Sequence, residues 1–219
     1  MAEGAWALTL HQAAGLVGAY RWTEDRLFAL TGRWAAEPAM TPEAQVHLFE
    51  ASAGHAWRAE MWAERLPVLD GVDHKALTRP AGPVLAPLLD ALEAVGGGDQ
   101  DGRPGPGLAV ARMVGLHRVV LPRLATTYRR HLARAVPVAD GPLSRTLRLV
   151  LGDLGGEQAT GAAVLAHLLA AGTGDAVSVA AERAEREIAA CLAGGSDQGD
   201  LVPWPGVAGD PAGGPPGRP

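Results

Sequence analysis

Residues 41–67, TPEAQVHLFEASAGHAWRAEMWAERLP, give the clearest indication of the fold. Thr41 is a favourable N-cap, Pro42 suits the first helical turn, and Glu43 complements the helix dipole there. Pro67 ends the pattern, because a proline lacks the backbone N–H that a helix interior needs. The stretch therefore predicts one long helix that runs up to this proline, and its apolar residues cover much of the circumference.

Long helices are predicted on both sides of this stretch, because apolar residues recur there with a period of 3.6 residues. They span about residues 8–35, 108–135 and 142–171, with shorter helices at 84–95 and 175–193. Pro122 predicts a kink in the third long helix, and four glycines predict that the middle of the fourth is weaker or bent. Since no alternating strand pattern exceeds a few residues, we expect an all-α protein.

The lengths of the connections predict how these helices pair. Short turns make the first and second long helices antiparallel neighbours, and the third and fourth likewise. The connection between the pairs, residues 68–107, is about 40 residues long and permits a crossover. Its end, GGGDQDGRPGPG at 96–107, has the composition of a linker. We expect one up-down four-helix bundle domain over residues 1–193, with one extra C-terminal helix.

Residues 194–219 form a Gly/Pro-rich tail that we expect to be disordered by itself. It contains one apolar patch, Leu201-Val202-Pro203-Trp204-Pro205. Docking of this patch onto its own domain is the favoured interpretation. A protein partner that binds the tail around Trp204 is the alternative.

Composition excludes several classes of function. Hydrophobic residues make up 47% of the 219, which is enough for a sizeable core, while the net charge of −5 argues against nucleic acid or an anionic membrane as partner. Cys191 is the single cysteine, so neither an internal disulfide nor a multi-cysteine zinc site can form. The sequence also lacks a P-loop, a dinucleotide fingerprint and a Gly-x-Ser-x-Gly elbow.

The location follows from similar reasoning. Residues 1–10 lack a basic region followed by a long apolar run, so we expect no secretory signal. The longest apolar stretch, 162–171, is too short to span a bilayer. We therefore expect a cytoplasmic protein, and the two apolar stripes of the helix in 41–67 would suit a homodimer.

Charged and imidazole side chains interrupt the apolar stripes of the long helices. They are Glu24 in the first, Glu50 and His55 in the second, His117 in the third, and Glu157 in the fourth. Burying a carboxylate without a partner costs several kcal/mol, so each needs a cation, a hydrogen-bond network or a proton. In an antiparallel pair at about 1.5 Å per residue, Glu24 reaches the depth between Glu50 and His55.

Acids and histidines at mid-depth in such a bundle resemble the ferritin-like di-iron carboxylate superfamily. The resemblance is one of pattern and covers residues 8–171. That family uses one Glu from each of two helices and a Glu-x-x-His pair from each of the other two. Glu24 and Glu50 match glutamates of the first two helices, whereas His117 stands where a glutamate is expected and no Glu-x-x-His occurs. The resemblance thus implies a degenerate or altered set of metal ligands.

Two functions follow from this resemblance. The first is a non-haem metal-dependent oxidoreductase, in which an altered site holds iron or manganese. Its ligands would be Glu24, Glu50, His55, His117 and Glu157. The second is a non-catalytic bundle that has lost the metal and binds a protein or a small molecule. A purely structural role is also open, in which Glu24 pairs with one of three arginines, Arg58, Arg118 or Arg148.

Overall fold

The computed structural model describes residues 8–95, 107–172, 175–192 and 200–205 of the 219-residue chain. These residues form helices and connecting loops without any strand, so the all-α prediction is confirmed. The long helices are α1 (Leu10–Ala35), α2 (Pro42–Ala63), α7 (Gly141–Ala171) and the continuous run of α5 (Leu108–Val114), η1 (Gly115–Val120) and α6 (Leu121–Arg134). The shorter helices are α3 (His74–Leu77), α4 (Leu85–Ala94) and α8 (Asp175–Ala190).

Local signals place the starts of the first two helices. The Thr41 hydroxyl accepts a hydrogen bond from the backbone N–H of Ala44 and caps α2, as the sequence predicts. Thr9 caps α1 in the same way, and Gln12 completes a reciprocal capping box with it. These bonds satisfy N–H groups that have no partner inside the helix, which fixes where each helix begins.

The irregularity predicted at Pro122 takes the form of a π-helical segment, η1, directly before α6. Proline has no N–H to donate to the preceding turn, so the regular hydrogen-bond ladder is interrupted there. The π-helical segment carries His117, and π-helical turns are frequent where a functional side chain must be placed. In contrast, α7 runs unbroken through its glycines.

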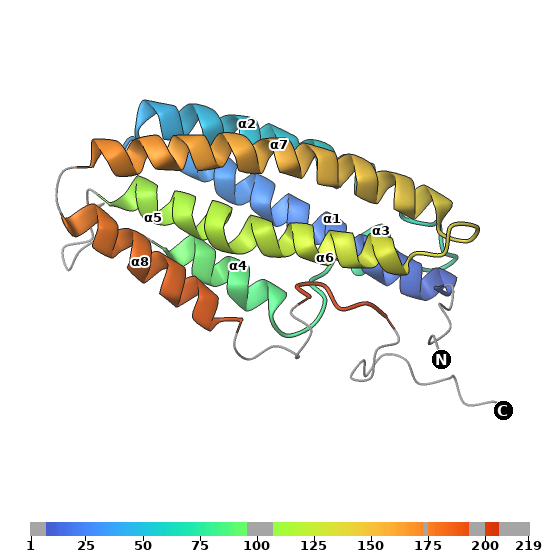
Figure 1. Ribbon diagram of the computed structural model, residues 1–219. Coiled ribbons are helices and arrows are strands. Elements are labelled where there is room, and N and C mark those ends of the chain that lie inside the picture. Colours follow the sequence, from blue (N-terminus) through green and yellow to red (C-terminus); the bar gives the residue numbers. More distant parts are fainter. Residues whose placement is uncertain (1–7, 96–106, 173–174, 193–199, 206–219) are drawn as a thin grey trace.

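The long helices form two antiparallel pairs, α1 with α2 and α6 with α7 (Figure 1). The colours in Figure 1 show that α4 runs back along the bundle, so that α5 begins at the end where α2 begins. The expected crossover is therefore present, and a helix lies within it. α2 lies beside α7, and Tyr20 of α1 meets Tyr128 of α6 edge-on at 5.0 Å between ring centres, which closes the ring of four.

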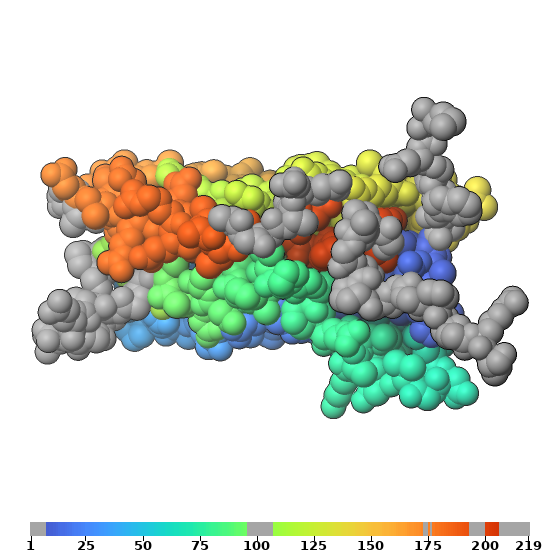
Figure 2. All heavy atoms as spheres, turned by 90° about the horizontal axis from the view of Figure 1, so that it is seen from below, coloured from blue at the N-terminus to red at the C-terminus, as the bar shows by residue number. Residues whose placement is uncertain are grey.

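Residues 200–205 are docked on the bundle, as the favoured interpretation expects. Leu201, Val202 and Trp204 are buried, and the Leu201 N–H donates to the Thr127 hydroxyl at 3.0 Å. Figure 2 shows this segment, in red, against the yellow-green surface that includes α6. The remainder of the predicted tail, 194–199 and 206–219, and most of the linker-like stretch, 96–106, lie outside the described residues.

None of the helices that the structure describes combines the length and the apolar character that a membrane span needs.

Candidate functional site

The centre of the bundle is organised around Glu24 of α1, whose side chain is completely buried. Its Oε2 accepts hydrogen bonds from His55 Nδ1 at 2.6 Å and from Arg58 Nε at 3.0 Å, both on α2. Its Oε1 accepts a hydrogen bond from the Tyr128 hydroxyl of α6 at 3.0 Å. Because a carboxylate only accepts, the bond to Glu24 places the proton of His55 on Nδ1. Arg58 Nη2, which lies 2.7 Å from the same nitrogen, then donates to Glu157 instead. Three donors from two other helices thus compensate the buried charge.

Arg58 extends this cluster to the fourth helix. Its Nη2 donates to Glu157 Oε2 of α7 at 2.6 Å, so one guanidinium joins two carboxylates. His55 Nε2 lies 3.3 Å from Glu157 Oε1, within ion-pair distance but without the alignment of a hydrogen bond. We call Glu24, His55, Arg58, Tyr128 and Glu157 the Arg58 network. It ties all four long helices together in the middle of the bundle.

The electrostatics of the Arg58 network favour its charged state. Burial would raise the pKa of both carboxyls, but the nearby Arg58 and His55 outweigh it and hold the pKa of Glu24 below its usual value. For Glu157 the same balance, with His55 as the stronger partner, lowers the pKa to about 2. Burial would lower the pKa of His55, yet Glu157 and Glu24 raise it overall. Two anions and two cations therefore neutralise each other in the buried centre.

A second buried contact lies next to the Arg58 network. His47 Nε2 of α2 and His117 Nε2 of η1 are 2.9 Å apart, and neither Nδ1 has a hydrogen-bond partner among the described residues. In a hydrogen bond between these two nitrogens, one must carry a proton and the other must be unprotonated in order to accept. The two rings therefore cannot both be positively charged. Burial, and then the neighbouring His47, lower the pKa of His117 to about 4, so the pair is neutral at pH 7. Gly161 of α7 leaves the space for the His117 ring, since an added Cβ would lie 2.2 Å from that ring.

A groove opens between α2 and α7 above this centre, with a volume of about 450 Å³. The Arg58 and Glu157 side chains reach its floor from the buried side. The groove is lined by small residues and charged residues, namely His47, Glu50, Ala51, Gly54, Arg58, Gly152, Asp153, Gly156, Glu157 and Thr160. Through this groove a molecule from outside could approach the Arg58 network.

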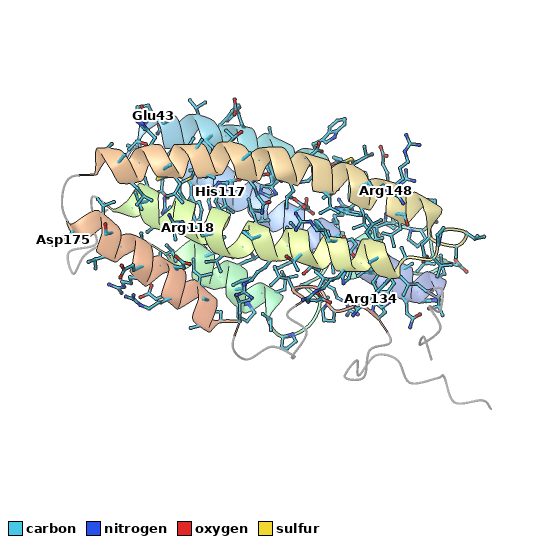
Figure 3. The ribbon with its side chains drawn as sticks, viewed as in Figure 1. Glu43, His117, Arg118, Arg134, Arg148 and Asp175 are labelled. Carbon is cyan, nitrogen blue, oxygen red and sulfur yellow. The ribbon has the colours of Figure 1, made fainter. Side chains whose placement is uncertain are left out.

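The structure brings together three of the five predicted metal ligands. Glu24, His55 and Glu157 meet in the Arg58 network, while His117 faces His47. Figure 3 shows His117 between its own helix and α7. Glu50 is exposed at the rim of the groove, so the prediction that it lies with the others in the centre is wrong.

The physical reason for the position of Glu50 is the rotation of α2. Periodicity leaves open which stripe of a helix faces inward when the helix is apolar on several sides. In the bundle, the inward stripe carries His47, Ala51, His55 and Arg58, which are all buried. Glu50 lies on the adjacent, exposed side.

The residues in the centre do not fit a di-iron or mononuclear metal centre. The Arg58 guanidinium occupies the position between Glu24 and Glu157 in which a metal cation would have to neutralise both carboxylates. Across the described ranges, no three His, Cys, Asp or Glu side chains are arranged to hold a metal ion. The metal-ligand set predicted from the sequence therefore has no geometric support in this part of the chain.

Of the three arginines considered as partners of Glu24, Arg58 is the one that the fold places there. Arg118 lies 3.8 Å from Glu185 of α8, and Arg148 is on the exposed side of α7 (Figure 3). Sequence reasoning missed Tyr128. A signal was available, because Tyr128 follows Leu121 by seven positions and Leu124 by four, and so continues their apolar stripe.

No known protein family, curated protein or solved structure matches this chain.

Proposed function

We propose that this protein is a ferritin-like helical bundle without a catalytic metal, which acts as a binding module through the groove between α2 and α7. The order and direction of the long helices support the ferritin-like part of the proposal. Two antiparallel pairs joined by a long crossover are typical of that architecture. The groove, at about 450 Å³, has the volume of a small-molecule site.

The single observation that carries the proposal is the position of Arg58. Its guanidinium lies 3.0 Å from Glu24 and 2.6 Å from Glu157, and its side chain is 2% exposed. A metal ion at this place would have to expel a buried cation from both of its partners. Separating such a buried pair costs about 3–5 kcal/mol, because an unpaired charge then remains in the core. An internal cation thus takes over the role that a metal has in a di-iron protein.

The metal-free part of the proposal is tested by metal loading. The full chain, purified without an affinity tag or chelator, is incubated anaerobically with Fe²⁺ or Mn²⁺, freed of unbound ions and measured by mass spectrometry. We expect far less than one metal ion per chain. Near-stoichiometric iron or manganese that disappears in the Glu24→Gln variant would refute this part and support the oxidoreductase alternative.

The binding part is tested by thermal unfolding with a panel of cationic, anionic and neutral metabolites. A ligand that binds the native protein raises its midpoint, provided it does not bind the unfolded chain. The matched variant is Gly156→Leu, which fills the groove from an exposed position where an added Cβ meets no atom within 4 Å. We expect at least one compound to stabilise the wild type and not the variant. If no compound distinguishes the two proteins, the binding module is refuted.

A further inference from the structure

Packing explains one of the glycines on α7 but not the others. Gly161 is required by packing, because a Cβ there would lie 2.2 Å from the His117 ring. Gly152, Gly155 and Gly156 are different, since an added Cβ would meet nothing within 4 Å. Glycine is the poorest helix former after proline, so these three weaken α7 with no return in packing. Two of them, Gly152 and Gly156, line the groove, where they leave the α7 backbone open to close approach.

The rim of the groove is acidic and lacks cations. Glu50 on α2 and Asp153 on α7 both line it, both are exposed, and neither has an ion pair among the described residues. The cation at the floor, Arg58, is already shared between Glu24 and Glu157. The exposed rim therefore carries net negative charge that the protein itself leaves uncompensated.

A buried polar atom at the groove supplies an independent observation. Nδ1 of His47 has no hydrogen-bond partner in the described part of the chain, and the His47 side chain lines the groove. The His47 residue is 4% exposed. Buried polar atoms are nearly always paired, so an unsatisfied one beside a groove indicates a missing partner. When Nε2 of His47 donates to His117, Nδ1 of the same ring is bare and accepts a hydrogen bond from a donor such as an amine.

We propose that the groove between α2 and α7 binds a small organic cation that carries amine groups. One ammonium group lies between Glu50 and Asp153 and donates to them. The hydrocarbon part lies on the bare backbone at Gly152 and Gly156. A second amine donates to Nδ1 of His47 at the floor. An anion is disfavoured because three carboxylates line the groove and its single guanidinium is taken. This inference rests on the proposed binding function and names the class of ligand.

The test is calorimetric titration of the full chain with putrescine and spermidine, with the uncharged diol of putrescine's chain length as the control ligand. We expect saturable binding of the amines, with one amine per chain, and none of the diol. The variant Glu50→Gln/Asp153→Asn should weaken amine binding by about tenfold, because two charge-assisted hydrogen bonds at a solvated rim are lost. A charge-matched control, Glu60→Gln/Glu64→Gln, removes the exposed carboxylates of Glu60 in α2 and of Glu64 at its C-cap, both outside the groove, and should leave the affinity unchanged.

The glycines provide a test in which stability and binding move in opposite directions. Gly156→Leu should raise the unfolding midpoint, since leucine is a much better helix former, and should abolish amine binding. Equal weakening in both charge variants would overturn the proposal, because it would mean general attraction to an acidic protein.

The outcomes also separate this inference from the proposed function. If no amine binds, but an anionic or neutral metabolite stabilises the wild type and not Gly156→Leu, the cation class is wrong and the binding module stands. If no compound of any class distinguishes them, both are wrong.

Discussion

Replacing Arg58 by methionine should remove the contact that holds the centre of the bundle together. The guanidinium makes charge-assisted bonds of 3.0 Å to Glu24 and 2.6 Å to Glu157, and the buried methionine would leave both carboxylates with His55 as their single cation. Methionine is also unbranched and adapts to irregular packing, so the lost volume matters little. Removing one partner of a buried ion pair costs about 3–5 kcal/mol. We expect this loss in the free energy of unfolding, which is a large share of the 5–15 kcal/mol of a typical domain.

The measurement is urea unfolding at pH 7 followed by far-UV circular dichroism. Arg65→Met is the matched control, because Arg65 is 38% exposed and lies 3.7 Å from Glu64 at the surface. Exposed pairs of this kind contribute less than about 1 kcal/mol. If Arg58→Met loses no more stability than Arg65→Met, the reasoning about the network is refuted.

The pH dependence of the same variant gives a second check. In the wild type, the lowered pKa values of Glu24 and Glu157 stabilise the protein above pH 4.5, and for Glu157 this stabilisation is lost as the pH falls towards about 2. Without Arg58, both carboxyls protonate at higher pH, which relieves the unpaired charge. The difference between wild type and Arg58→Met should therefore be smaller at pH 4 than at pH 7. If the two proteins differ in stability by the same amount at both pH values, the loss in Arg58→Met does not come from unpaired carboxylate charge.

Three further results are expected. Trp204→Ala should cost about 3 kcal/mol in urea unfolding, because the ring is 9% exposed and packs 5.1 Å from the His131 ring between centroids. Gly161→Ala should lower the thermal midpoint, since its Cβ would lie 2.2 Å from the His117 ring, whereas Gly155→Ala should raise it by the equivalent of about 0.5–1 kcal/mol. Burial lowers the pKa values of His117 and His131 to about 4. Acidification from pH 6.5 to about 4, followed by urea unfolding, should therefore lower the free energy of unfolding by about 3 kcal/mol for each of them.

Each of these has an outcome that contradicts it. Trp57→Ala is the control for the tail, because Trp57 is 67% exposed and should change stability little. Equal effects of the two tryptophan variants would argue against docking of residues 200–205. A stabilising Gly161→Ala would show that the His117 ring is free to move away. In the acid series, the histidines of the unfolded chain take up protons below pH 6.5, whereas those of the folded protein do so near pH 4. A free energy of unfolding that does not change between these pH values would contradict the conclusion that both histidines are buried in their neutral form.

The helices could be predicted closely from the sequence, because their ends depend on neighbouring residues. Thr41 and Pro42 start α2 through contacts within one turn, and the prediction from 142 to 171 agrees with α7, Gly141–Ala171. The crossover followed from the length of the chain between the second and third long helices. These features need no knowledge of distant contacts.

The centre of the site could be predicted in part. Glu24, His55 and Glu157 were identified because charged groups in apolar stripes must be compensated. Their partner, Arg58, is 34 residues from Glu24 and 99 residues from Glu157 in the chain, and the sequence alone left three arginines open for Glu24. The choice depends on how α2 is rotated against α1 and α7.

Local residue patterns were enough to establish that the chain is helical, where most helices begin and end, and that charges had to be neutralised inside. Which groups neutralise these charges, and which stay at the surface, depended on how the helices pack. The apolar residues of α2 run around the helix, so periodicity could not tell that His55 faces the centre while Glu50 and Trp57 face outward. Rotation is set by packing against three other helices at once, and that packing turns Arg58 inward, where it joins the two carboxylates.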